Sequence, residues 1–170
     1  LRELSEAVHG EADRLARRVY LFAESNKNDT LHVRAPEGGG YGLDGLWNDD
    51  FHHALQSLLT GEQAGYYRDF GTLGHLARAI RDGFALTGQY SHYRGRRQGV
   101  SSESVPATKF VVYCQNHDQV GNRLRSERLS QLIAFEELKL AASIVLLSPA
   151  IPLLFMGEEW GSKQPFLFFS

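Results

Sequence analysis

A short apolar run that passes abruptly into a polar cluster constrains this chain more than any other feature. Residues 110–114 read FVVYC, which has the length and the β-branched content of a strand buried on both faces. The polar residues that follow are Gln115, Asn116, His117, Asp118, Gln119, Asn122 and Arg123. Parallel α/β folds place active sites at the carboxyl ends of such strands, because the strand holds the cluster rigidly. The alternative is a solvated turn in which Asp118 caps a helix and Gly121 makes the bend.

A second apolar run also ends on a carboxylate. Residues 19–23 read VYLFA and are followed by Glu24. If the two strands share a parallel sheet, Glu24 and Asp118 project from the same edge. Paired carboxylates are what cleavage of a glycosidic bond requires, one to protonate the leaving oxygen and another to stabilise the oxocarbenium-like centre. The two acids could equally be metal ligands or helix caps.

Composition narrows the class of protein and its partners. The chain has 170 residues, of which 42% are hydrophobic and 22% are charged, and these values are ordinary for a soluble globular domain. A net charge of −2 gives no basis for attraction to nucleic acid or to a membrane. The single cysteine, Cys114, excludes an internal disulfide, fits a reducing cytoplasm and is expected to be buried. The longest apolar stretch, 140–156, contains two prolines and is shorter than the ~20 residues that span a bilayer.

Helical and strand patterns alternate along the chain. We expect helices at 1–18, 51–59, 73–84 and 132–147, and strands at 19–23, 41–47, 110–114 and 151–156. Residues 48–50 offer N-cap oxygens for the second helix. Residues 65–70 are predicted to be an insertion rather than part of the core, and 87–108 a long loop that is either a functional lid or disordered. The apolar end of the last helix, 140–147, is expected to be largely buried.

This alternation predicts an α/β fold with a parallel sheet and right-handed crossovers. An open doubly wound sheet and a (β/α)₈ barrel both satisfy it. No glycine-rich phosphate fingerprint follows any strand, which argues against a nucleotide-binding sheet. Strands that end in acids, histidine and tryptophan favour the sugar-binding rim of a barrel. A complete barrel has eight strands and about 250 residues, so we expect half of one, with open apolar edges at 20–23 and 153–156.

Four strings carry a family resemblance. They are FAESNKND at 22–29, YGLDGLWNDDFHHAL at 41–55, FVVYCQNHDQVGNR at 110–123 and LLSPAIPLLFMGEEWG at 146–161. In this order they resemble the α-amylase family of glycoside hydrolases (family 13). The resemblance implies that residues 1–170 are a partial catalytic domain, the C-terminal half (strands five to eight) of a TIM (β/α)₈ barrel. The first four strands and the C-terminal β-domain of the family are then missing from the chain, which we expect to be a fragment.

The resemblance also implies roles for the residues after the strands. Glu24 becomes the general acid/base, Asp118 the carboxylate that grips sugar hydroxyls and helps to distort the ring, and His117 a hydrogen-bond partner of the same sugar. The nucleophilic Asp of the family and its neighbouring Arg lie upstream of Leu1, outside this chain. From the residues alone, Asp118 would have been the nucleophile. Asn26 is a departure, because relatives tend to carry Asp there.

Further residues are predicted to bind substrate. They are Asn116, Trp47, Asp49, Asp50, His52, Arg123, Glu158 and Trp160. Tyr41 and Tyr66 are two more candidate platforms for sugar stacking, although core packing explains each aromatic about as well. The adjacent His52 and His53 point in different directions around a helix, so they do not easily share one metal, and we expect one of them to donate a hydrogen bond into the site. We expect neither a metal nor a cofactor.

The reaction implied is hydrolysis, with retention, of the α-1,4-glucosidic bond next to a terminal trehalose unit. The substrate is then an α-glucan, maltooligosyl-trehalose, and the pathway is trehalose biosynthesis from α-glucans. Two alternatives stay open: another α-glucan hydrolase or branching enzyme of the family, and a non-catalytic glucan-binding half-barrel, since the nucleophile is absent. The expected partner is the missing N-terminal half of the barrel, with no nucleic acid and no membrane. Alone, the chain is expected to be inactive.

Overall fold

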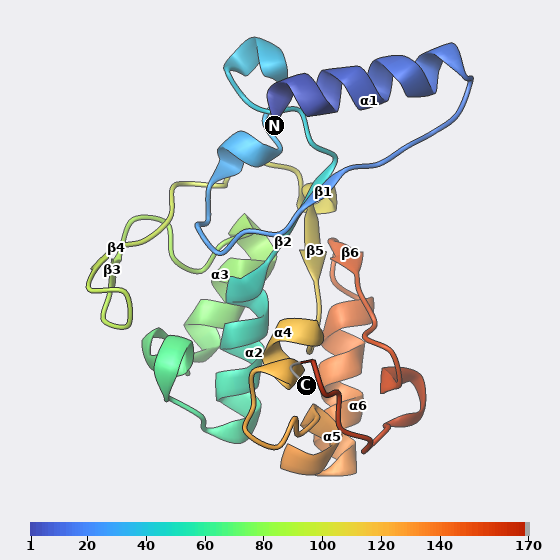
Figure 1. Cartoon of the computed structure of the whole chain (residues 1–170). Coiled ribbons are helices and arrows are strands. Elements are labelled where there is room, and N and C mark those ends of the chain that lie inside the picture. Colours follow the sequence, from blue (N-terminus) through green and yellow to red (C-terminus); the bar gives the residue numbers. More distant parts are fainter. Residues whose placement is uncertain (169–170) are drawn as a thin grey trace.

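Four parallel strands form the centre of the molecule. The computed structural model describes residues 1–168, and its main sheet has the strand order β1-β2-β5-β6. The strands are β1 (Phe22–Ala23), β2 (Gly45–Trp47), β5 (Phe110–Val112) and β6 (Ile151–Pro152). The register pairs Phe22 with Gly45, Leu46 with Phe110 and Val111 with Ile151. Each strand lies beside the next one along the chain, as the predicted alternation requires (Figure 1).

Helices connect the strands. α1 (Arg2–Arg14) precedes the sheet, α2 (Asp49–Thr60) and α3 (Leu73–Asp82) link β2 to β5, and α4 (His117–Gly121), α5 (Leu129–Leu132) and α6 (Phe135–Leu146) link β5 to β6. Short 3₁₀ helices lie at Thr30–His32, Pro36–Gly38, Gly65–Asp69, Ala107–Lys109 and Glu158–Trp160. The predicted loop at 87–108 is ordered and contains an antiparallel hairpin of β3 (Tyr90–Ser91) and β4 (Arg96–Arg97). The α/β class and the parallel sheet are therefore confirmed.

The strands are shorter than the apolar runs predict. Only two or three residues of each strand pair with a neighbouring strand. Single backbone hydrogen bonds continue the pairing by one residue in two places. The Asn48 N–H donates to the Val111 carbonyl at 2.9 Å, and the Leu153 N–H donates to the Val112 carbonyl at 2.8 Å. Asn48 is already the cap of the next helix. The strand ends where the next helix begins, and the length of an apolar run in the sequence does not predict that residue.

The core is organised around α2. Asn48 Oδ1 accepts a hydrogen bond from the Phe51 N–H at 3.2 Å, and Gly61 ends the helix with a φ of 71°, in the left-handed region that glycine adopts without strain. Phe51 and Leu55 are fully buried and belong to the same apolar cluster as Val112 of β5. The predicted helix at 51–59 is thus confirmed, and Asn48 is one of the residues predicted to offer its cap.

The prediction that 65–70 is an insertion outside the core is wrong. Tyr67 and Phe70 are both buried, and Phe70 packs in the main apolar cluster with Phe51 and Leu76. The His53 ring lies 5.2 Å from the Phe70 ring and 5.4 Å from the Tyr67 ring, between centroids. The polar neighbours of these aromatics concealed their burial, because a 3₁₀ helix has no long periodic pattern.

α1 attaches to the rest of the chain through polar contacts. Leu4 of this helix and Leu1 just before it are both exposed. Arg2 Nε donates to the Gly40 carbonyl at 3.1 Å, and Ser5 Oγ donates to the Gly42 carbonyl at 3.0 Å. His9 Nε2 lies 2.9 Å from Asp44 Oδ2. Figure 1 shows α1 lying across the end of the molecule at which β5 begins.

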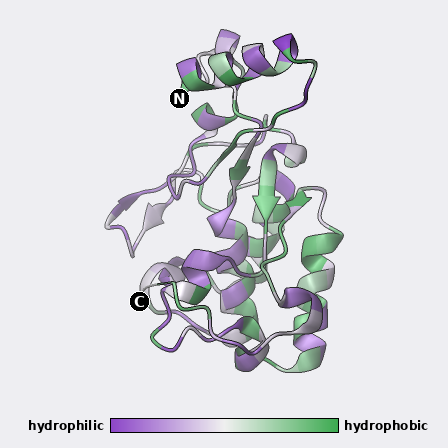
Figure 2. Ribbon diagram, turned by 45° about the vertical axis from the view of Figure 1, so that its right-hand side comes forward, coloured by the Kyte–Doolittle hydropathy of each residue, from purple (hydrophilic) through white to green (hydrophobic). Residues whose placement is uncertain are grey.

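The predicted burial of residues 140–147 is also wrong for the described part of the chain. Figure 2 shows α6 as largely hydrophobic, but only Ala141 and Val145 of this helix are buried, and Leu147 just after it is 85% exposed. The helix turns one face to the sheet and leaves the other open. At the edge strands, Phe22 and Leu154 are likewise exposed, which agrees with the predicted apolar edges.

Cys114 is buried, as predicted, and burial raises the pKa of its thiol above the usual value. Among the described residues, no helix combines the length and the apolar character that crossing a bilayer requires.

Candidate active site

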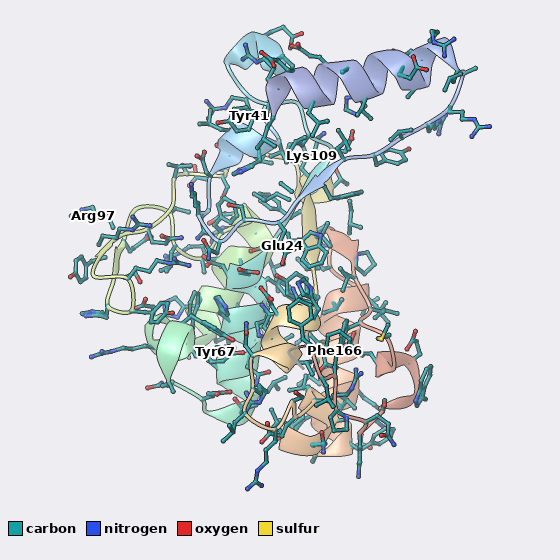
Figure 3. All side chains as sticks on the ribbon, in the orientation of Figure 1. Glu24, Tyr41, Tyr67, Arg97, Lys109 and Phe166 are labelled. Atoms are coloured by element: carbon teal, nitrogen blue, oxygen red, sulfur yellow. The ribbon has the colours of Figure 1, made fainter. Side chains whose placement is uncertain are left out.

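Three neighbouring strands deliver polar and aromatic side chains to one edge of the sheet. Glu24 directly follows β1, Trp47 is the last residue of β2, and His117 and Asp118 open α4 shortly after β5. Parallel strands present their carboxyl ends at the same edge, so these groups meet. The shared edge predicted for Glu24 and Asp118 is therefore confirmed. Figure 3 shows Glu24 near the centre of the molecule, whereas Lys109, just before β5, lies toward α1.

The two carboxylates meet at the His117 ring. His117 Nε2 lies 3.5 Å from Glu24 Oε1 and 3.5 Å from Asp118 Oδ1. One nitrogen or oxygen atom of each of the three residues lies within 4.8 Å of the others. The side chains are 49% exposed for Glu24, 47% for Asp118 and 27% for His117. A substrate from solution can therefore reach all three groups.

The polar turn after β5 has a cap, but Asp118 is not the cap. Asn116 Oδ1 accepts hydrogen bonds from the Asp118 N–H at 2.9 Å and the Gln119 N–H at 3.3 Å, and Asn116 is itself buried. This cap starts α4 and leaves the Asp118 side chain free to face the edge of the sheet. The structure places Asn116 as a support of this turn rather than at its surface.

Trp47 and Tyr113 form one wall of the site. The Trp47 ring contacts the rings of His117 and Tyr113 edge-on, at 5.8 Å between centroids in each case. The buried Tyr113 hydroxyl donates a hydrogen bond to Asp49 Oδ1. Partial burial raises the pKa of Asp49 above its usual value, the negative charges of Glu24 and Asp118 raise it further, and the Tyr113 hydrogen bond opposes this. Asp49 thus belongs to the same electrostatic cluster as the two exposed acids.

His52 does not reach into this site. Its Nδ1 lies 2.6 Å from the Cys114 carbonyl, which can only accept, so Nδ1 carries the proton and Nε2 accepts from the Tyr67 hydroxyl at 2.9 Å. Burial lowers the pKa of His52 to about 4, and the ring is neutral at physiological pH. His53 is also buried and stacks on Tyr66 at 4.7 Å between ring centroids. The expectation that one of these histidines donates into the site is therefore wrong for His52, whereas His53 lines a small hollow beside Asp49.

Asp50 is buried as well, and its carboxylate faces the protein interior. Its Oδ2 accepts three hydrogen bonds, from Asn28 Nδ2 at 2.8 Å, the Ala85 N–H at 2.9 Å and the Leu86 N–H at 2.7 Å. The neighbouring acids Asp49 and Asp50 thus diverge, one toward the exposed acids and the other into the core. The sequence alone does not show which of the two neighbouring acids is buried.

Three further predicted binding residues lie apart from the Glu24 cluster. Arg123 Nη1 donates to Glu62 Oε2 at 2.9 Å and lines an open hollow of about 340 Å³. Glu158 accepts from the Phe155 N–H at 2.8 Å, lines a cavity of about 200 Å³ beside α6, and burial raises its pKa to about 7. Trp160 is 75% exposed on its 3₁₀ helix.

Of the two extra stacking candidates, Tyr41 lies away from the cluster, whereas Tyr66 shares a small hollow with Asp49 and Asn26. Figure 3 shows Tyr41 beside α1, where its ring contacts His32 edge-on at 5.7 Å between centroids. Tyr66 packs on His53 and lines the Arg123 hollow. Sequence reasoning missed Tyr113 and Asn28 as supports of the site. Tyr113 looked like strand filler, and nothing in the sequence marks the long-range partners of Asn28.

Glu24, His117 and Asp118 also satisfy the geometry of a metal site. One imidazole and two carboxylates are acceptable ligands for several divalent cations, and their ligand atoms cluster within 4.8 Å. Exposed acids beside a histidine are just as suitable for proton transfer and for hydrogen bonds to sugar hydroxyls. The geometry alone permits both functions.

A parallel α/β sheet with acids at its carboxyl edge is the arrangement of an α/β enzyme, and comparison with known proteins makes the class specific. No protein-family model matches the chain. The malto-oligosyltrehalose trehalohydrolase of Saccharolobus solfataricus is 45% identical over 170 residues, which cover 100% of this chain and 29% of that protein. The enzymes of the same name from Mycobacterium tuberculosis and Arthrobacter ramosus are each 43% identical over 171 residues, or 30% of their lengths.

Solved structures agree. A provisionally assigned α-amylase from Salmonella typhimurium superposes with a TM-score of 0.90 at 43% identity, over 100% of this chain and 29% of that one. A maltogenic α-amylase from Thermotoga neapolitana, 12% identical, matches 98% of this chain and 30% of its own with a TM-score of 0.56, which supports the fold alone. The chain is thus a relative of the α-amylase family. Along its whole length it is homologous to malto-oligosyltrehalose trehalohydrolases, and it spans about 30% of their length.

Proposed function

We propose that the longer protein containing this chain hydrolyses the α-1,4-glucosidic bond next to a terminal trehalose unit and releases trehalose from maltooligosyl-trehalose. The observation that carries the proposal is the meeting of Glu24, His117 and Asp118 at the carboxyl edge of a parallel sheet. The names of relatives 40–45% identical along the chain supply the substrate class. Trehalose biosynthesis from α-glucans is the pathway that this reaction serves.

In the proposed reaction Glu24 acts twice. As a general acid it gives its proton to the glycosidic oxygen while the bond to the anomeric carbon breaks, and as a general base it takes a proton from the water that completes hydrolysis. Asp118 and His117 bind hydroxyls of the sugar beside that bond, and Trp47 offers a ring face to the same sugar. The half-exposed Glu24 carboxylate is accessible to both the leaving oxygen and the water.

The nucleophile of a retaining mechanism is proposed to lie outside this chain. Retaining glycosidases hold their two carboxyl groups about 5–5.5 Å apart. The nearest Glu24 and Asp118 oxygens lie within 4.8 Å of each other, slightly closer than that range, so spacing alone would also allow Asp118 to attack. The family resemblance gives Asp118 the hydroxyl-binding role instead. A covalent intermediate trapped on Asp118 would reverse this assignment.

The proposed architecture is half of a barrel. The four parallel strands would be the fifth to eighth of a (β/α)₈ barrel, with residues 1–170 a partial catalytic domain that lacks the first four strands and the C-terminal β-domain. The exposed apolar side chains of Phe22 and Leu154, at the two edges, would then face the rest of the barrel. The 170-residue chain alone would be inactive because it lacks the nucleophile.

Substrate choice tests the proposed reaction. The full-length protein is incubated with maltooligosyl-trehalose and, separately, with maltodextrin of equal length, and released trehalose and glucose oligomers are quantified. We expect trehalose from the first substrate and slow turnover of the second. Equal rates on both, or transfer of glucan branches, would support another α-glucan hydrolase or a branching enzyme. Binding of glucan without turnover would support a non-catalytic glucan-binding protein.

A variant pair tests the proposed acid. Glu24→Gln keeps the shape of the side chain but removes the proton donor, and general acid–base catalysis contributes typically ~10²–10⁴-fold. We expect kcat to fall by at least that factor while KM changes little. Glu103→Gln, at an exposed glutamate in the loop before β5, serves as the matched control and should retain wild-type turnover.

A further inference from the structure

The segment just after Glu24 is fastened to the protein interior by a buried polar network. Asn28 is buried and has a φ of 53°, in the left-handed region that Asn tolerates better than most residues. Its Nδ2 donates to Asp50 Oδ2 at 2.8 Å and to the Leu86 carbonyl at 3.0 Å. The same Asp50 oxygen also accepts the N–H groups of Ala85 and Leu86. One carboxylate therefore joins three parts of the chain.

Bonds from the hairpin loop hold the same segment from a second side. Gln98 Nε2 donates to the Asn26 carbonyl at 2.7 Å, and Arg94 Nη2 donates to that carbonyl at 3.2 Å. The Val100 N–H donates to the Asn28 carbonyl at 3.1 Å. Gly99 lets the loop approach this closely, because a Cβ there would lie 2.0 Å from the Leu86 carbonyl oxygen.

Glu24 itself has little direct support. Its side chain is half-exposed. Among the described residues, the ion pair that it forms is with His117, and the distance between Glu24 Oε1 and His117 Nε2 is 3.5 Å. A hydrogen bond of that length is weak. The direction of the Glu24 side chain is therefore set by the backbone on either side of it, namely the short β1 and the segment 25–28.

Asp50 is suited to hold that segment firmly. Burial raises the pKa of Asp50 to about 6, against the opposing effect of its N–H donors, so the carboxylate is charged at neutral pH. Hydrogen bonds to a charged acceptor are about twice as strong as neutral ones. Removing the acceptor would leave the buried N–H groups of Ala85 and Leu86 without a partner, and Asn28 would keep only its bond to the Leu86 carbonyl. An unsatisfied buried N–H group costs more free energy than its hydrogen bond contributes.

We propose that Asp50 is a positioning residue for Glu24. It acts through its hydrogen bond to Asn28 and does not itself contact the substrate. This inference rests on the proposed role of Glu24 as the acid. Among the described residues, no hydrogen bond joins the 25–28 segment to the groups proposed to bind the sugar, which are Trp47, His117 and Asp118. Loosening the segment therefore misplaces the acid while leaving the binding groups in place, and a misplacement of about 1 Å can cost ~10²-fold in rate.

The expected signature is a fall in kcat at nearly constant KM. In the full-length protein, Asp50→Ala should lower kcat about 10- to 100-fold. Asp50→Asn retains an acceptor oxygen for the three N–H donors and should recover most of the lost rate. Asn28→Gly keeps the left-handed backbone accessible but removes the link to Asp50, and it should lower kcat as well. The Asp50→Ala and Asn28→Gly effects should be far from additive, because both remove one connection.

Asp44→Ala is the matched control. Asp44 accepts from the Leu21 N–H at 2.7 Å, so it too fastens the chain beside β1, but before the strand rather than after it. We expect Asp44→Ala to lower the unfolding temperature and to leave kcat close to wild type, because the ladder with β2 still holds β1 in place. A stable Asp50→Ala protein with wild-type kcat would overturn the proposal, as would equal kcat losses in Asp44→Ala and Asp50→Ala.

Hydrogen exchange separates failure of this proposal from failure of the proposed function. Backbone amides of 25–29 should exchange faster in Asp50→Ala and Asn28→Gly than in wild type or Asp44→Ala, whatever the substrate is. Unchanged exchange in these amides would overturn the tether itself. A wild-type protein that releases no trehalose, but shows the exchange pattern, would keep the tether and reject the assigned reaction.

Discussion

The two ends of the parallel sheet are held together in different ways. At the carboxyl end, buried polar side chains such as Asn48, Asp50 and Asn116 fix the turns that carry the proposed site. At the amino end, α1 rests on the loop before β2 through the more exposed contacts of Arg2 and His9. Replacing a buried polar side chain at the carboxyl end should therefore lower the free energy of unfolding considerably. At the amino end, water can replace the hydrogen bonds that Arg2 and His9 make.

This difference follows from what each end must do. Groups that bind and protonate a substrate must stay in place while remaining partly exposed, so the support has to come from residues beneath them. Asn48 illustrates this, because its Nδ2 donates to the Gly83 carbonyl at 2.6 Å from a fully buried position between α2 and the end of α3. In parallel α/β enzymes, chemistry gathers at the carboxyl end and stability at the opposite end. Here the carboxyl end also holds buried polar side chains that fix its turns.

Truncating one apolar side chain on α1 and one on α2 should give the largest contrast in stability. Phe51→Ala empties a fully buried position on α2, and such changes typically cost about 3–5 kcal/mol. Leu4→Ala on α1 removes a side chain that is 54% exposed, and we expect less than about 0.5 kcal/mol. Urea unfolding of the 170-residue chain measures both. Equal losses would mean that α1 is packed as tightly as α2.

A smaller effect should appear as a pH dependence of stability. Burial raises the pKa of Glu158 to about 7 in the folded chain, above its usual 4.5. Because the folded chain binds this proton more tightly than the unfolded chain, the contribution to stability is complete below pH 4.5 and is lost as pH rises through 7, a loss on the order of 3 kcal/mol. Unfolding of the isolated chain should therefore become easier between pH 5 and 8. Glu158→Gln should flatten this dependence, whereas the control Glu103→Gln should leave it.

The smallest expected effect concerns metal ions at the carboxyl end. The arrangement of Glu24, His117 and Asp118 is suitable for binding a cation, but the proposed mechanism does not use a metal ion. We expect full-length enzyme dialysed against EDTA to keep its rate of trehalose release. Loss of activity that returns with one particular divalent cation would identify the cluster as a metal site and would remove the general-acid role of Glu24.

Much of the fold could be predicted from the sequence. The strands, their parallel arrangement and α2 with its caps follow from apolar runs, helical spacing and short-range cap residues, which are local signals. The strand ends, the burial of Tyr67 and the open face of α6 could not, because each depends on which distant segment packs there. An apolar helix in the sequence looks the same whether or not its second face is covered.

The sequence predicted the exposed residues of the candidate site. It did not predict the buried residues that hold them in place. Glu24, His117 and Asp118 follow apolar strands, and this local pattern is enough to bring them together. Asp49 and Asp50 are adjacent, and nothing local decides that one approaches the exposed acids while the other binds Asn28 and the backbone near Leu86. Such choices are made by tertiary contacts between residues far apart in the sequence.

The most direct test of the account is a crystal structure of the full-length Glu24→Gln variant with maltooligosyl-trehalose bound. The account predicts that the glycosidic oxygen next to the trehalose unit lies within hydrogen-bonding distance, about 3 Å, of the side chain at position 24. His117 and Asp118 should contact hydroxyls of the adjoining sugar. A substrate bound elsewhere, for example in the hollow beside Arg123 and Glu62, with that oxygen far from position 24, would contradict the central claim.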